Sequence, residues 1–90
     1  MPKIKNNIIE ITGTGNVIDS KVRIISIQAI ASADTSEAII TDDDGMEIAH
    51  FKSAETNLRT YVPIYLDRME INGINCDVFT NMTKVIIHLG

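Results

Sequence analysis

Apolar residues alternate with polar ones over much of this chain, and short polar turns interrupt the pattern. The longest such segment runs from Lys21 to Ala31, and its two-residue period predicts a strand. Both faces of that strand carry apolar side chains. The face that holds Arg23, Ile25, Ile27 and the alternate residues after them is the more apolar along its middle. The pattern predicts either a strand central to a sandwich or one that lies against a partner.

Shorter segments of the same kind follow at close intervals. They are Ile8 to Thr12, Glu37 to Thr41, Met46 to Phe51, Leu58 to Leu66 with Pro63 inside it, Ile74 to Phe79 and Lys84 to Leu89. In the last two, residues Ile74, Cys76, Val78, Val85, Ile87 and Leu89 are predicted to point inward. Val17 to Ser20 is compatible with a short return strand. This spacing predicts an all-β fold, a small antiparallel β-sandwich or barrel of about seven to eight short strands.

Glycine marks the predicted turns between these segments. Asp42 to Gly45 separates two β-like segments and is the strongest hairpin signal, because Gly45 supplies the positive φ that the turn requires. Asn72-Gly73 predicts a second hairpin turn of type I′. Gly13 to Asn16 and Thr80 to Thr83 are predicted as further turns, with a loop over Ser32 to Ser36.

The amino-acid composition supports the prediction of β structure. The short chain and its single cysteine also predict a small free energy of unfolding. Seventeen isoleucines stand against three leucines, and isoleucine packs well on a pleated surface. Ninety residues predict one domain over residues 1–90, with residues 1–7 as a polar N-terminal arm. A chain this short is marginal alone, and Cys76, its single cysteine, cannot form an internal disulfide. Association with other subunits is therefore expected, with a trimer among the possible homo-oligomers.

Charge and hydropathy limit the classes of binding partner that we expect. The net charge is −4, the eight lysines and arginines are scattered, and only four Phe and Tyr side chains are available to stack on bases. Direct binding of nucleic acid is therefore not expected. No segment has the length of a signal peptide or a membrane span, so we expect neither membrane binding nor secretion. A cytoplasmic protein or a virion component fits this pattern.

No motif carries a recognisable chemistry, and we predict no catalytic residue, metal site or cofactor. Asp42-Asp43-Asp44-Gly45 lacks the twelfth-position glutamate and flanking helices of a calcium loop, so it is interpreted as a solvated hairpin tip. Gly13-Thr14-Gly15 lacks the Lys-Ser or Lys-Thr of a phosphate loop. His50 and His88 form no local signature with Cys76, which is predicted to be a buried, inert thiol. An enzyme is not expected.

From Ser36 onward, the order of strands and turns resembles that of small β-sandwich virion proteins of tailed bacteriophages, notably head-decoration (cement) proteins. The segments Thr41 to Ile48, Asn72 to Ile74 and Lys84 to Leu89 carry this resemblance. It implies a non-catalytic, often trimeric protein on the capsid surface that binds the major capsid protein where capsomers meet. It assigns no role to any individual residue.

Two segments are the predicted interface on that interpretation. They contribute Lys3, Ile4, Lys5, Ile8, Ile9 and Ile11 from the N-terminal arm and the strand after it, and Ile25 and Ile27 from the long strand. An arm of this kind can pair with the sheet edge of a neighbour. The alternatives are another virion component, such as a head–tail connector, tail or fibre-base subunit, or a cytoplasmic adaptor that binds a peptide at a sheet edge.

Overall fold

The fold is all-β, as the alternating pattern predicts. A computed structural model of the chain describes residues 3–5, 7–33, 35–53, 61 and 63–90. Within these residues there are seven strands: β1 (Lys3–Lys5), β2 (Ile8–Ile11), β3 (Gly15–Ala31), β4 (Ser36–Thr41), β5 (Glu47–Ser53), β6 (Ile64–Thr80) and β7 (Met82–Leu89). They form one antiparallel sheet in the order β1-β2-β7-β3-β6-β4-β5.

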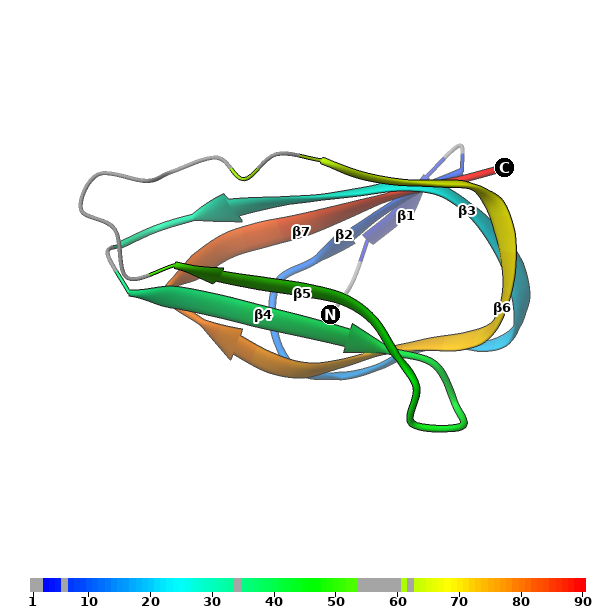
Figure 1. Cartoon of the computed structure of the whole chain (residues 1–90), viewed down its shortest axis with the longest axis horizontal. Helices are drawn as coiled ribbons and strands as arrows, with labels where there is room; N and C mark the ends of the chain where they lie inside the picture. Colours follow the sequence, from blue (N-terminus) through cyan, green and yellow to red (C-terminus); the bar gives the residue numbers. More distant parts are fainter. Residues whose placement is uncertain (1–2, 6, 34, 54–60, 62) are drawn as a thin grey trace.

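The sheet folds over on itself because its two central strands are long and bend together. β3 and β6 have 17 residues each, so these two are not the short strands expected from the sequence. They pair along most of their length, and Figure 1 shows the paired ribbon curving around one end of the molecule. The first layer comprises β1, β2, β7, residues 24–31 of β3 and residues 64–69 of β6. The second layer comprises β5, β4, residues 75–80 of β6 and residues 15–18 of β3.

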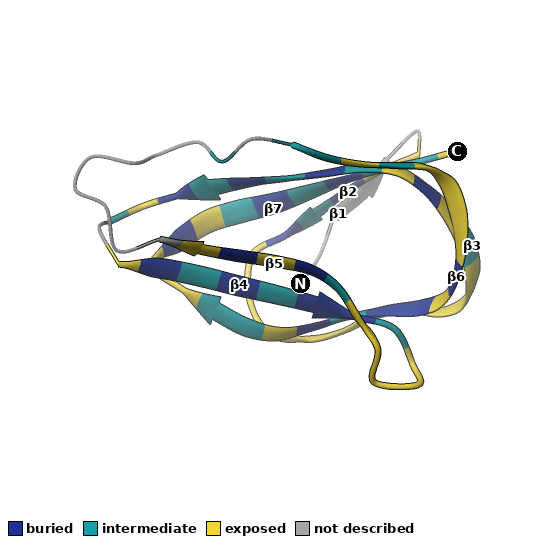
Figure 2. Cartoon of the chain, viewed as in Figure 1, coloured by how far each residue is buried: buried dark blue, intermediate teal, exposed yellow. Residues whose placement is uncertain are grey.

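The core lies between the two layers and consists mainly of isoleucine. Ile9, Ile87 and Ile27 are neighbours across β2, β7 and β3 of the first layer, and all three are fully buried. Ile40 and Ile74 contribute equally buried side chains from the second layer. Figure 2 shows buried residues alternating with exposed or half-buried ones along the strands. The two-residue period therefore identifies the core correctly in most strands.

The predicted hairpin turn at Asn72-Gly73 is wrong, because β6 continues through it. Gly73 does adopt the positive φ that its sequence favours, +87°. The chain bends there without reversing, since the segments before and after it both pair with β3. Val22 pairs with Ile71 on one side of the bend, and Ile18 pairs with Ile74 on the other.

β3 differs from its prediction at its start and in its middle. It begins at Gly15, so Val17 to Ser20 belong to it and are not a separate return strand. A register shift between Ile24 and Ser26 then moves the alternation by one residue. Ile24 is buried, Ile25 is 37% exposed and Ile27 is buried again. The expected single apolar face is therefore divided at this β-bulge.

Other predicted segments agree with the structure apart from their ends. β4, β5, β7 and β2 match the predicted strands, and the Asp42 to Gly45 hairpin connects β4 to β5 with Gly45 at φ +84°. Lys3–Lys5 of the predicted arm pair with β2 of the same chain and form the first strand of the sheet. Residues 58–60 and 62 of the predicted strand from Leu58 to Leu66 lie outside the described residues, and β6 begins only at Ile64.

Candidate interaction surfaces

The outward side of the first layer carries several exposed or half-buried apolar side chains among polar ones. Ile8, Ser26 and Tyr65 are connected through His88 and their own pairing into one row across β2, β7, β3 and β6. Directly paired residues project to the same side of a sheet, and the adjacent row of Ile9, Ile87 and Ile27 points into the core. We call this surface the outer face. It comprises Ile8, Glu10, Ser26, Gln28, Ile30, Tyr65, Lys84, Ile86 and His88, with Ile25 beside it at the bulge.

Exposure on the outer face is concentrated in a few large side chains. Tyr65 is 74% exposed, Ile8 is 39% exposed and Ile25 is 37% exposed. Ile86 and Ile30 are half-buried in the next two rows of the face. Glu10 pairs with Ile86 and Lys84 pairs with Ile30, and Lys84 Nζ lies 3.3 Å from Glu10 Oε2 on this face. Apolar side chains and a tyrosine among charged groups are typical of a protein-binding patch.

The structure divides the predicted interface residues into two groups. Ile9, Ile11 and Ile27 are at most 1% exposed, so their assignment to an interface is corrected: they belong to the core. Ile8 and Ile25 are on the surface. The side chains of Lys3, Ile4 and Lys5 lie outside the described residues, but their backbone forms strand β1. Tyr65 and the half-buried Ile86 were missed, because only the strand register places them on the same face as Ile8.

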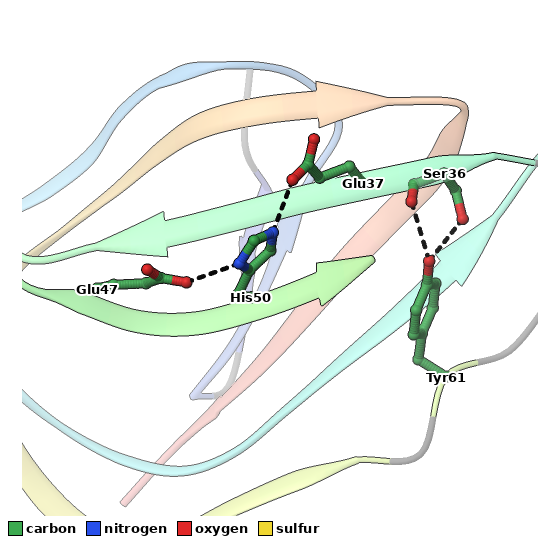
Figure 3. Close-up of polar contacts among 5 residues, drawn as sticks. All are labelled: Ser36, Glu37, Glu47, His50 and Tyr61. Atoms are coloured by element: carbon green, nitrogen blue, oxygen red, sulfur yellow. Dashed lines mark hydrogen bonds and ion pairs between the residues drawn. The ribbon is translucent and has the colours of Figure 1, made fainter. Parts of the chain in front are cut away.

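A histidine and two carboxylates form a polar cluster on the second layer (Figure 3). His50 Nε2 lies 2.6 Å from Glu37 Oε2, and His50 Nδ1 lies 2.9 Å from Glu47 Oε1. Both contacts are hydrogen bonds when each ring nitrogen carries a proton, as in the imidazolium ion. The His50 side chain is 37% exposed, so the cluster contributes little to stability. It ties β5 to β4 at the surface and places no nucleophile near the ring.

Tyr61 connects the two layers at one end of the core. Its backbone N–H donates to the carbonyl oxygen of Ala29 in the first layer at 3.0 Å. Its hydroxyl donates to the carbonyl oxygen of Ser36 in the second layer and lies 2.6 Å from Ser36 Oγ (Figure 3). Its ring packs edge-on against Phe51 at 5.3 Å. Tyr61 is thus partly buried, whereas Tyr65, four residues later, is exposed.

The acidic hairpin tip is fixed to the bend of β6. Asp42 Oδ1 accepts hydrogen bonds from the backbone N–H groups of Asp44, at 3.0 Å, and Met46, at 2.8 Å. The N–H of Asp43 donates to the carbonyl oxygen of Asn72 at 2.8 Å, and Asn75 Nδ2 donates to Asp43 Oδ1 at 3.0 Å. The Asp43 carboxylate occupies the space that a Cβ atom on Gly73 would need. The tip is therefore a docked structural element.

Cys76 is a core residue, as predicted. It is 2% exposed, and its Sγ lies 3.4 Å from the carbonyl oxygen of Val78. Burial and, to a lesser extent, the negative charge of Asp77 raise the pKa of the Cys76 thiol from 9.0 to about 11. The thiol is therefore neutral near pH 7, whereas a nucleophilic cysteine requires the thiolate.

A second apolar surface lies where the sheet closes least completely. Met46, which precedes β5, and Ile48 of β5 line a groove of about 370 Å³ together with Met69 and Ile71 of β6. Met69 pairs with the buried Ile24, so it projects to the core side of the sheet, yet it is 49% exposed. Met46 is 69% exposed. We call this surface the seam groove, and its acidic rim consists of Asp42, Asp44, Glu47 and Glu70.

Comparisons with known proteins add no relative. No protein-family model, curated protein or solved structure matches this chain. In the part of the chain that the structure describes, no helix is long and apolar enough to cross a membrane. Among those same residues, no three His, Cys, Asp or Glu side chains are arranged to hold a metal ion.

Proposed function

We propose that this protein is a non-catalytic assembly subunit that binds a larger protein array through the outer face of its first layer. The observation that carries this proposal is the row of Ile8, His88, Ser26 and Tyr65. Two of these four residues are large hydrophobic side chains with high exposure. An aromatic and aliphatic patch on a rigid sheet is a favourable docking surface, because binding it orders few additional side chains.

Within that class, we favour a capsid decoration protein of a tailed bacteriophage that binds the outer shell at capsomer junctions. The strand order from Ser36 onward and the Asp42 to Gly45 hairpin still support the resemblance. The Asn72-Gly73 turn no longer does, because β6 passes through it. A small domain with an apolar outer face gains stability when an array covers that face. The partner is then the major capsid protein, and the location is the virion surface.

Co-sedimentation with capsid shells tests this function. The shells are those of the virus whose genome carries the gene, and they are mixed with the purified protein at micromolar concentration. Wild-type protein is expected to pellet with the shells at saturable stoichiometry. Tyr65→Arg places a charge on the most exposed apolar side chain of the outer face and should reduce the bound fraction by about tenfold or more. Thr80→Arg adds the same charge to an exposed site on the second layer and should bind as wild type.

Two results would contradict the proposal. Equal binding by the Tyr65→Arg and wild-type proteins would remove the outer face as the docking surface. A gene located among cellular genes, without capsid or portal genes nearby, would contradict the decoration role. Circular dichroism of both variants controls for folding, and because both positions are exposed we expect unchanged spectra.

A further inference from the structure

We propose that copies of this chain associate edge to edge, with β1 of one copy pairing along β5 of a second copy beside the seam groove. This contact uses neither Tyr65 nor Ile8, so it is independent of the outer face and of the function proposed above. It gives the subunit a second, self-complementary interaction. The occupant of the seam groove is then the basic N-terminal strand of a neighbouring copy.

The first argument is that the sheet has two edge strands, each with one side that is unpaired among the described residues. β1 and β5 are the first and last strands in the sheet order, so each pairs with one neighbour only among the described residues. The unpaired side of an edge strand presents backbone N–H and C=O groups that can bind another strand. β1 has three residues and β5 has seven, so the shorter edge fits within the longer.

The second argument is the apolar surface beside β5. Met46, Ile48 and Met69 line the seam groove, and two of them are about half or more exposed. Met69 is exposed although it projects toward the core side, because no described strand pairs with residues 64–71 of β6 on the side away from β3. A strand added at β5 would cover this groove and bury apolar area.

The third argument is charge complementarity. The rim of the seam groove carries Asp42, Asp44, Glu47 and Glu70, whereas β1 has the sequence Lys3-Ile4-Lys5. The far end of β5 carries the exposed Lys52, so a basic strand is attracted to the end near Glu47. Complementary charge fixes the register of such a contact and excludes alternatives such as pairing of two β5 edges, each with the same acidic rim.

The contact is heterologous, because different edges of the two copies meet. Repetition of such a contact produces a ring when the rotation closes and an open chain when it does not. A three-residue strand provides little contact area, so we expect association to be weak and concentration-dependent. A trimeric ring is one closed form compatible with this geometry.

A charge-exchange experiment tests the proposal by sedimentation velocity. Wild-type protein should associate in the micromolar range, and salt near 0.5 M should weaken the association about tenfold. Lys3→Glu/Lys5→Glu should weaken it at least as much, as should Asp44→Lys/Glu47→Lys. An equimolar mixture of the two variants should associate again, because each supplies the edge that the other lacks. Thr83→Glu and Thr14→Lys, both exposed and outside the two edge strands and the groove lining, are the controls.

A second measurement does not depend on variants. Zero-length carbodiimide treatment of mixed isotopically light and heavy wild-type protein should produce mixed-isotope cross-links between Lys3 or Lys5 and the rim carboxylates. The proposal is overturned by a monomer at all concentrations, which would leave the groove to a basic segment of another protein. It is also overturned by association that survives both charge reversals. Loss of shell binding in Tyr65→Arg with unchanged self-association would separate this contact from the outer face.

Discussion

Two glycine sites in this chain have nearly the same local conformation and opposite effects on its path. Gly45, after three aspartates, has φ +84°, and Gly73, after Asn72, has φ +87°. At Gly45 the chain reverses, and β4 pairs with β5. At Gly73 the chain bends but continues as one strand for 17 residues. The two sites also touch, because Asp43 from the hairpin tip packs against Gly73.

The difference shows that a glycine signal determines a dihedral angle and leaves the direction of the chain open. Around Gly45, the flanking segments pair with each other from Ser36 with Ser53 to Thr41 with Glu47. Around Gly73, both flanking segments pair instead with the antiparallel strand β3, and the two strands bend together. A hairpin at Gly73 would exchange these pairings for pairing between residues 64–71 and 74–80. Partners distant in sequence therefore decide between a turn and a bend.

The largest expected effect comes from placing a side chain at each glycine. Gly45→Ala should cost roughly 1–2 kcal/mol of unfolding free energy, because its φ is positive but the space around it is open. Gly73→Ala has the same backbone penalty and also displaces the Asp43 carboxylate. Losing that contact adds about 1 kcal/mol, for a total of roughly 2–3 kcal/mol. Urea unfolding of the two variants measures the difference.

The double variant Gly73→Ala/Asp43→Ala separates the two contributions. If Asp43 packs against Gly73, both substitutions remove the same contact, so the double variant should lose about 1 kcal/mol less than the sum of the two single losses. Equal destabilisation by Gly45→Ala and Gly73→Ala, with additive losses in the double variant, would mean that the two glycine sites differ only in the direction of the chain. The contact between the tip and the bend would then have no energetic role.

The sequence predicts elements that depend on local pattern and misses those that depend on pairing. The alternation of β2, β4, β5 and β7 and the turn at Gly45 follow from neighbouring residues. The continuation of β3 through Asp19 is not predictable from apolar alternation, because that stretch is polar and exposed. The bulge after Ile24 is equally hidden, and it separates Ile25 on the surface from Ile27 in the core, although both were expected on one face.

The same limit applies to the candidate surfaces. Ile8 and Ile9 are adjacent in sequence, and composition alone treats them alike. Pairing with β7 places Ile8 beside His88 on the outside and Ile9 beside Ile87 in the core. Tyr65 joins Ile8 only through two intervening strands. An apolar residue can thus be assigned to a surface only when its register is known.

A smaller effect on the unfolding free energy should distinguish Asp43 from Asp44 in the hairpin tip. Asp43→Ala removes the acceptor for Asn75 Nδ2 and should cost about 1 kcal/mol. Asp44→Ala should cost less than about 0.5 kcal/mol, because its exposed side chain is aimed at the rim and not at the bend. A double-mutant cycle of Asp43→Ala with Asn75→Ala should give a coupling of about 0.5–1 kcal/mol. Zero coupling would show that the tip is held by its backbone bond to Asn72 alone.

The smallest effect at neutral pH, and the most specific, concerns the strand after the bend. Ile74 and Cys76 face the core there, and burial raises the pKa of the Cys76 thiol to about 11 in the folded state. Between about pH 9 and 11, the unfolded chain therefore loses this proton more readily than the folded chain does. The stability associated with the neutral thiol is complete below pH 9 and declines as the pH rises toward 11.

Cys76→Ala isolates this contribution from the lysines and tyrosines that titrate in the same range. The wild type should lose more unfolding free energy than Cys76→Ala when urea titrations at pH 8 and at pH 10.5 are compared. At pH 8 itself the two proteins should differ only by the cavity left by the smaller side chain. Parallel pH dependence in the two proteins would place the thiol in water, and the inward alternation of β6 beyond Gly73 would then be wrong. The inward position of Cys76 depends on the chain bending at Gly73 without reversing. This titration therefore also tests the contrast between Gly73 and Gly45.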